Sequence, residues 1–99
     1  MNLEKLDALE KPQALKILIA IKDIPVLTRE EIYSMMIGSK PTKVARINEL
    51  IEAGLIKETK QGLHNRKILS ITKKGREAAG VITELNNILV DYKNDSNNH

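Results

Sequence analysis

The amino-acid sequence predicts a mainly α-helical fold with a small β-wing, built as a single domain. Three observations lead to this prediction. Apolar residues recur every three or four positions over most of the chain, two short apolar runs flank a polar loop that contains glycine, and capping or turn residues separate the segments. A length of 99 residues leaves little material for a second domain. The expected domain covers residues 1–93, and residues 94–99 are expected to form a disordered polar tail.

The first helical segment is expected over about residues 2–22. Pro12 divides it, and because proline suits the first turn of a helix, the main helix should begin near Lys11. The apolar residues on either side of the proline keep helical spacing: Leu3, Leu6, Leu9, Leu15, Ile17, Leu18 and Ile21. The apolar run over residues 24–27 is too short for a full strand, but it can add an edge strand beside a hairpin.

A short helix should follow, from Thr28 through Ile37. Thr28 and Glu31 have the spacing of a capping box, in which hydroxyl and carboxylate each satisfy a backbone N–H at the helix start. Gly38 can adopt the backbone conformation that reverses the chain after a helix. Three apolar side chains of this helix are expected to face the core: Ile32, Met35 and Met36.

The next helix should begin after Ser39, whose hydroxyl can cap it, and end near Gly54. Four apolar residues at spacings of three and four form a stripe that must face the core: Val44, Ile47, Leu50 and Ile51. At about 100° per residue, the side chains expected to project away from this stripe are Thr42, Ala45, Arg46 and Glu49. Lys40 and Lys43 should lie at the amino-terminal end.

Two strands and a long helix complete the chain. The strands are expected over residues 55–59 and 67–71, with a cationic loop at residues 60–66 between them. Thr72 can cap the final helix. Apolar positions there continue up to Tyr92, so this helix of about 20 residues would be roughly 30 Å long. A domain of this size does not need such a length to cover its own core.

The excess apolar surface predicts a homodimer. The residues expected at its interface come from both ends of the chain: Leu3, Leu6, Leu9, Val81, Leu85, Ile88 and Tyr92. The alternative is packing of the last helix against the first one within the same chain. We favour the homodimer, because an exposed apolar patch of this kind would otherwise promote aggregation.

The charge distribution favours a polyanionic partner. Residues 40–76 carry ten Lys and Arg residues against three Glu residues, a net charge of +7, whereas residues 1–31 and 77–99 are slightly acidic. A polyanion would meet the middle segment first. The chain contains no cysteine and no apolar run that could span a membrane, so we expect a cytoplasmic location without membrane contact.

Two motifs resemble those of winged helix-turn-helix DNA-binding regulators, especially the MarR, PadR and ArsR-like groups. They are Glu-Ala-Gly-Leu-Ile at residues 52–56, before the hairpin, and Ile-Thr-Lys-Lys-Gly at residues 71–75, after it. The resemblance covers about residues 12–80. It implies that residues 39–53 form the recognition helix, which enters the major groove of DNA, and that residues 60–67 contact phosphates or an adjacent groove.

The residues expected to contact double-stranded DNA lie on the recognition helix and on the wing. On the helix, Arg46 and, as a second candidate, Lys43 should reach guanine edges, while Ser39, Lys40 and Thr42 bind phosphate or sugar. The wing supplies phosphate contacts from Lys60, His64, Asn65, Arg66 and Lys67. Insertion of Arg66 into a narrow minor groove is left open. In both places a merely solvated surface is the alternative.

No cofactor, metal or catalytic site is expected. His64 stands alone on a polar loop, His99 lies in the tail, and no nucleophile, base and orienting residue form a group. The preferred interpretation is a sequence-specific transcriptional regulator, most simply a repressor. A winged-helix protein-interaction module and a weakly specific architectural chromatin protein are the alternatives. The sequence does not determine the operator or any small-molecule effector.

Overall fold

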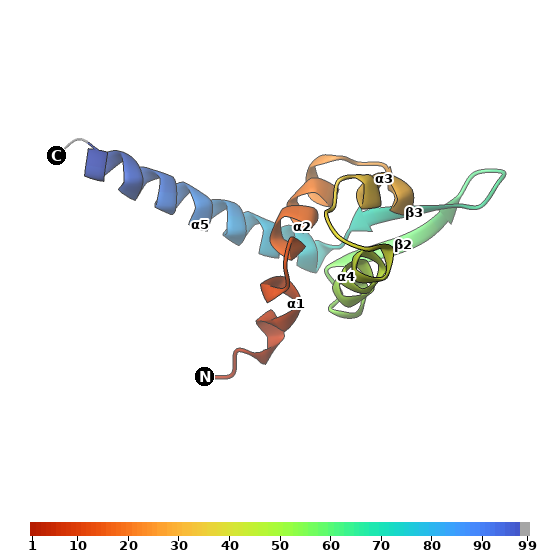
Figure 1. Cartoon of the computed structure of the whole chain (residues 1–99), viewed down its shortest axis with the longest axis horizontal. Helices are drawn as coiled ribbons and strands as arrows, with labels where there is room; N and C mark the ends of the chain where they lie inside the picture. Colours follow the sequence, from red (N-terminus) through yellow and green to blue (C-terminus); the bar gives the residue numbers. More distant parts are fainter. Residues whose placement is uncertain (98–99) are drawn as a thin grey trace.

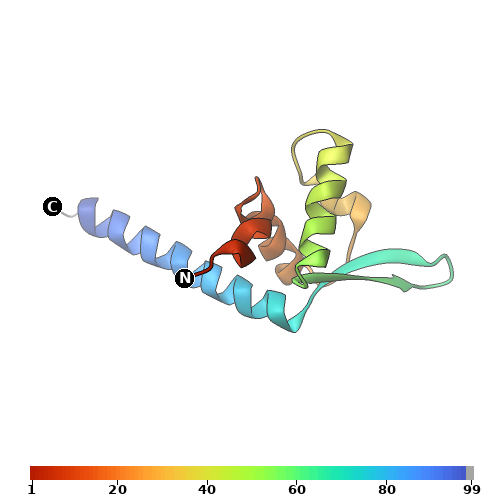
Figure 2. The same ribbon diagram turned by 90° about the horizontal axis from the view of Figure 1, so that it is seen from below.

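The structure, a computed structural model, describes the backbone of residues 1–97 and the side chains of residues 1–92. Its elements in chain order are η1 (Glu4–Leu6), α1 (Asp7–Glu10), α2 (Ala14–Asp23), β1 (Leu27–Thr28), α3 (Arg29–Ser34), α4 (Lys40–Glu52), β2 (Ile56–Gln61), β3 (Arg66–Ile71) and α5 (Lys73–Asn97). The β2–β3 hairpin and α5 extend from opposite sides of the helical body (Figure 1, Figure 2). The predicted fold, mainly α-helical with a small β-wing, is confirmed.

The helix α2 begins at Ala14, later than the predicted start near Lys11. Gln13 has a left-handed backbone (φ 71°), so Pro12 lies in the preceding turn and not in the first turn of the helix. The Gln13 side chain forms two hydrogen bonds with the backbone of Ile37: Nε2 donates to the carbonyl and Oε1 accepts from the N–H, both at 2.8 Å. This amide therefore fixes the turn between α3 and α4 against the start of α2.

The predicted capping box at the start of α3 is confirmed. The Thr28 hydroxyl accepts from the Glu31 N–H, and the Glu31 carboxylate accepts from the Thr28 N–H. The helix is shorter than predicted, because it ends at Ser34 and not at Ile37. Met35 therefore leaves the helix and is exposed, which makes its predicted place in the core wrong; Tyr33 is buried instead, beside Ile32 and Met36.

Replacement of Glu31 by Gln is expected to lower stability at neutral pH but not at low pH. Hydrogen bonds from the Thr28 backbone N–H and then from its hydroxyl hold the pKa of Glu31 below its usual value of 4.5. Because the folded-state pKa is the lower one, ionised Glu31 stabilises the fold above the unfolded pKa, and this contribution is lost as the pH falls through the folded pKa. Glutamine keeps the acceptor oxygen but carries no charge.

Thermal unfolding of the wild type and of Glu31→Gln should therefore differ at about pH 7 and converge at an acidic pH below the folded-state pKa of Glu31. A difference of the same size at both pH values would mean that the substitution acts through packing and not through the carboxylate charge.

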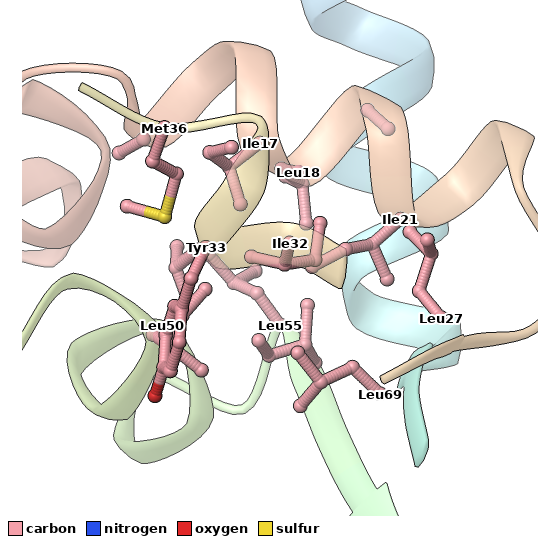
Figure 3. Close-up of a cluster of buried hydrophobic side chains, with 14 residues drawn as sticks. Ile17, Leu18, Ile21, Leu27, Ile32, Tyr33, Met36, Leu50, Leu55 and Leu69 are labelled. Atoms are coloured by element: carbon pink, nitrogen blue, oxygen red, sulfur yellow. The ribbon is translucent and has the colours of Figure 1, made fainter. Parts of the chain in front are cut away.

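The hydrophobic core lies where α2, α3 and α4 meet the sheet (Figure 3). The predicted stripe of α4 faces inward: Ile47 and Leu50 are fully buried, and Val44 and Ile51 are partly buried against the core. With no Phe or Trp in the chain, this core is built mainly from branched aliphatic side chains of the following residues: Ile17, Leu18, Ile21, Leu27, Ile32, Leu55, Ile56 and Leu69.

The sheet has three antiparallel strands in the order β1-β3-β2. The expected edge strand is present but very short, with Leu27 opposite Leu69. The hairpin strands run closer to the loop than predicted, from the pair Ile56–Ile71 to the pair Gln61–Arg66. Gly62 and Asn65 have positive φ angles of 79° and 52°, and the Asn65 N–H donates to the Gly62 carbonyl at 3.2 Å. This turn closes the tip of the wing.

Thr72 caps α5 as predicted, because its hydroxyl accepts from the Gly75 N–H at 2.9 Å. The first turns of α5 pack on α2 through Ala79, with Ala78 and Ile82 partly buried, and the rest of the helix projects from the body (Figure 2). The backbone of residues 94–97 continues α5, unlike the disordered tail predicted from residue 94; residues 98–99 lie outside the described part of the chain. No helix in residues 1–97 has the length and apolar character needed to span a bilayer.

Candidate nucleic-acid interface

The solvent-facing side of α4 carries small, uncharged side chains from Pro41 to Asn48. Pro41, Ala45 and Asn48 are exposed and follow one another at helical spacings of four and three, with Thr42 beside them. The Ser39 hydroxyl caps the helix by accepting from the Thr42 N–H at 3.4 Å. Lys40 is the exposed cation of the first turn, so positive charge on this face is concentrated at one end of the helix.

The predicted exposure of Arg46 is wrong. Arg46 is only 8% exposed, and its Nη1 lies 2.8 Å from the Glu49 carboxylate. The cause is long-range packing: α4 contacts α1, α2 and β2, so its buried side is wider than the aliphatic stripe and includes the neighbouring position 46. A guanidinium held in this way does not reach a base edge.

Lys43 is also engaged within the protein. Its side chain is half-buried, and its Nζ donates to the Tyr33 carbonyl at 2.9 Å, near the end of α3. A cation at this position interacts favourably with the negative, carboxyl-terminal end of the α3 helix dipole. In the free chain Lys43 therefore has a structural role between the two helices, and its contact with a guanine edge stays a prediction.

The five predicted wing residues are all exposed: Lys60, His64, Asn65, Arg66 and Lys67. Among residues with described side chains, none of the three cations in this set forms an ion pair. Lys60 and Lys67 lie directly opposite each other in the strand register. Like charges at such a position repel, so the hairpin carries a positive charge that an anion would relieve.

A surface hollow joins the two predicted groups of cations. It lies between the start of α3, the start of α4 and β3, and its lining includes Lys40, Arg66 and Lys67. Lys40 also lies 3.7 Å from the Glu30 carboxylate and 5.9 Å from the centre of the Tyr33 ring. The structure thus brings the helix cation and two wing cations to one place, while Arg46 and Lys43 lie elsewhere.

Arg29 is the residue of this region that the sequence analysis missed. Its guanidinium pairs with Glu58 on β2, donates to the Tyr33 hydroxyl at 2.8 Å and donates to Asn48 Oδ1 at 2.8 Å. Burial lowers the pKa of Arg29, but the bonds to Glu58 and Tyr33 raise it above its usual value. The spacing of Arg29 and Tyr33 on one helix face was visible in the sequence, whereas the partners on β2 and α4 depend on tertiary structure.

The residues predicted at a dimer interface are mostly exposed in the single chain. Leu3 and Leu6 are exposed, while Leu9 is partly buried against the core. On α5, four side chains are 51–70% exposed: Val81, Leu85, Ile88 and Tyr92. The alternative of packing within the chain therefore applies to the first turns of α5, and the outer part of the helix keeps an uncovered apolar face.

The order α3, turn, α4, hairpin defines a winged helix-turn-helix fold. No protein-family model and no curated protein matches the sequence. Among solved structures, the chain is similar to a variant of S. aureus MepR with a TM-score of 0.82 and 16% identity, over 94% of this chain and 71% of that one.

Two further similar structures have the same architecture. FabT from Streptococcus pneumoniae, in complex with DNA, has a TM-score of 0.74 and 17% identity, over 94% of this chain and 70% of that one. A MarR protein from Peptoclostridium difficile has a TM-score of 0.73 and 24% identity, over 92% of this chain and 61% of that one. The chain therefore shares the winged-helix fold of these solved structures. The chain spans less than two thirds of that last protein's length.

Proposed function

We propose that the chain is a sequence-specific, double-stranded DNA-binding transcriptional regulator, acting in the cytoplasm as a homodimer and most simply as a repressor that blocks a promoter. The observation that carries this proposal is the hollow in which Lys40 of α4 meets Arg66 and Lys67 of the wing. It lies beside a helix face with small side chains that can approach base edges closely. One similar structure, FabT, was solved in complex with DNA.

In this proposal, α4 enters the major groove from its amino-terminal end and the wing lies on the adjacent phosphates. Ser39, Lys40 and Thr42 contact phosphate or sugar at the groove edge. Glu49 and Glu52 lie toward the carboxyl end of α4, where phosphates would repel them, so insertion extends no further along the helix than Asn48. Residues 1–93 form the DNA-binding unit, with both ends of the chain contributing to the dimer.

The homodimer follows from the uncovered face of α5. Burial of large aliphatic side chains is favourable by roughly 1.5–3 kcal/mol for each fully covered side chain. Two copies related by a two-fold axis could cover this face reciprocally and present two α4 helices to a two-fold symmetric site. The short helices at the amino terminus, with Leu3 and Leu6 exposed, extend the same interface in this proposal.

The salt dependence of DNA affinity tests the proposal. A protein that neutralises phosphates releases counterions, so its affinity should fall steeply as salt rises. Each of Arg66→Ala and Lys67→Ala should weaken binding to all sequences alike and reduce the slope of log affinity against log salt by about 1. Lys16→Ala removes an exposed cation of α2, outside the hollow and the wing, and serves as the control with an unchanged slope.

Fluorescence anisotropy with duplexes enriched from a random pool provides the measurement. If the affinity changes neither with salt concentration nor with the wing substitutions, this result would contradict DNA binding and favour a protein-interaction module. Equal affinity for enriched and random duplexes would contradict sequence specificity and favour an architectural protein.

A further inference from the structure

We infer that Asn48 reads a base in the major groove as a hydrogen-bond donor, and that Arg29 is the positioning residue that restricts it to this role. The inference rests on the proposed DNA-binding function and deepens it by naming the base preference. It assigns direct sequence reading to Asn48 and the positioning of that side chain to Arg29, 19 positions earlier in the chain.

The composition of the exposed α4 face singles out Asn48. Arg46 is buried and Lys43 is bonded to the Tyr33 carbonyl, so in the free chain both side chains are engaged within the protein. Pro41 and Ala45 have no polar side-chain atoms, and Thr42 lies beside the cap at the helix start. Asn48 is then the exposed amide side chain on this face of α4, one helical turn after Ala45 and directly before Glu49.

The hydrogen bond from Arg29 decides what Asn48 can offer to a base. Arg29 Nη2 lies 2.8 Å from Asn48 Oδ1, and since a guanidinium has only donors, the atom facing it must be the amide oxygen. The Nδ2 group with its two hydrogens is left for other partners. An asparagine that reads adenine usually uses both amide atoms, accepting from N6 and donating to N7. Here one of the two lone pairs of the accepting atom is already engaged in a charge-assisted bond, which makes this oxygen a weaker acceptor for N6.

The contacts that hold Arg29 in place make this arrangement rigid in the free protein. The guanidinium is bonded to the Glu58 carboxylate on β2 and to the Tyr33 hydroxyl, and its side chain is only 20% exposed. Fixing the side chains in the free protein reduces the entropy cost of ordering them on binding. The same three-way contact connects the base of the wing with α4, so the reading side chain and the hairpin are held in one geometry.

An amide whose oxygen is held by Arg29 offers mainly its N–H donors, and such an amide fits guanine better than adenine. In the major groove, guanine presents two neighbouring acceptors, N7 and O6, whereas adenine presents the acceptor N7 next to the N6 donor. The Ala45 methyl group, one turn earlier, is suited to contact with a thymine methyl. We therefore expect each half-site to contain a guanine opposite Asn48.

In vitro selection of bound duplexes, carried out with the full chain, tests the inference. The wild type should enrich guanine at one position of each half-site, and Asn48→Ala should lose that preference alone, with about a tenfold or larger loss of discrimination there. Asn86→Ala removes an exposed amide side chain of α5, outside α4 and the wing, and should keep the guanine preference.

The second part of the test removes the contact by which Arg29 positions Asn48. The double variant Arg29→Met, Glu58→Gln replaces both members of the ion pair and leaves no unpaired charge. It frees Asn48 Oδ1 and should shift the selected base from guanine toward adenine, a change that loss of a purely structural contact would not produce. Circular dichroism with a thermal melt establishes that the variant is folded.

The failure of this inference differs from the failure of the proposed function. If the wild type binds no DNA in a salt-dependent manner, the proposed function is wrong, and the inference fails with it. If the wild type selects a sequence but Asn48→Ala selects the same one, or if the wild type selects adenine at the position that depends on Asn48, only the inference is overturned.

Discussion

Replacement of Gly75 by alanine is expected to destabilise the protein by about 3 kcal/mol or more, at the upper end of the range for overpacked sites. A Cβ atom added at Gly75 would lie 1.9 Å from the Leu55 carbonyl oxygen and 2.9 Å from Ile71 Cγ1. The Leu55 carbonyl cannot retreat easily, because it accepts from both the Thr72 N–H and the Thr72 hydroxyl. Alanine at position 75 would therefore force the start of α5 away from the body.

Gly80→Ala is the matched control, because Gly80 lies in the same helix, is exposed, and a Cβ atom there would meet nothing within 4 Å. Alanine is favoured over glycine in a helix by about 1 kcal/mol, so this variant should be more stable than the wild type. Urea unfolding followed by circular dichroism gives both free energies of unfolding. If Gly75→Ala were as stable as Gly80→Ala, the close approach of α5 to Leu55 would not exist in solution.

This contrast also explains the motif Ile-Thr-Lys-Lys-Gly at residues 71–75. Thr72 caps α5 and holds two backbone carbonyls, of Gly54 and Leu55, while Gly75 lets the helix approach. Lys74 donates to the Ala53 carbonyl at 2.8 Å, at the carboxyl end of α4. These roles are structural, so the motif indicates how α5 joins the wing and carries no information about base preference.

Features that depend on neighbouring residues were predictable from the sequence. The capping box of Thr28 and Glu31, the caps at Ser39 and Thr72, and the inward stripe of α4 each involve residues three or four positions apart. Local stereochemistry determines such contacts, and tertiary packing did not override it here.

The errors concern residues whose environment is set by distant elements. Arg46 is on the flank of α4, and whether that flank is covered depends on where α1, α2 and β2 pack. Arg29 and Glu58 are 29 positions apart, and their pairing requires α3 to lie beside the base of the wing. A periodic pattern identifies the centre of a buried face, but not its width or the polar side chains recruited at its edge.

Replacement of Leu85 and Ile88 together by aspartate is expected to convert the proposed dimer to a monomer and to reduce operator affinity by roughly a hundredfold or more. The affinity loss follows because two linked DNA-binding domains bind about 10²–10⁴ times more tightly than one. Both side chains lie on the uncovered face of α5, 53% and 51% exposed, so two carboxylates there would have to be desolvated in a symmetric interface.

The paired control is Asn86→Asp, Asn87→Asp, which adds the same charge at exposed positions on the other side of the helix. It should remain dimeric in gel filtration with light scattering and bind DNA much more tightly than the monomeric variant. Because Ala79 is the last fully buried residue of α5 within residues 73–92, whose side chains are described, neither double variant should lower the melting temperature of the single domain itself. A folded monomer should also show about half the salt slope, since it contacts one half-site. A dimer that persists in the Leu85→Asp, Ile88→Asp variant would place the interface elsewhere on the molecule.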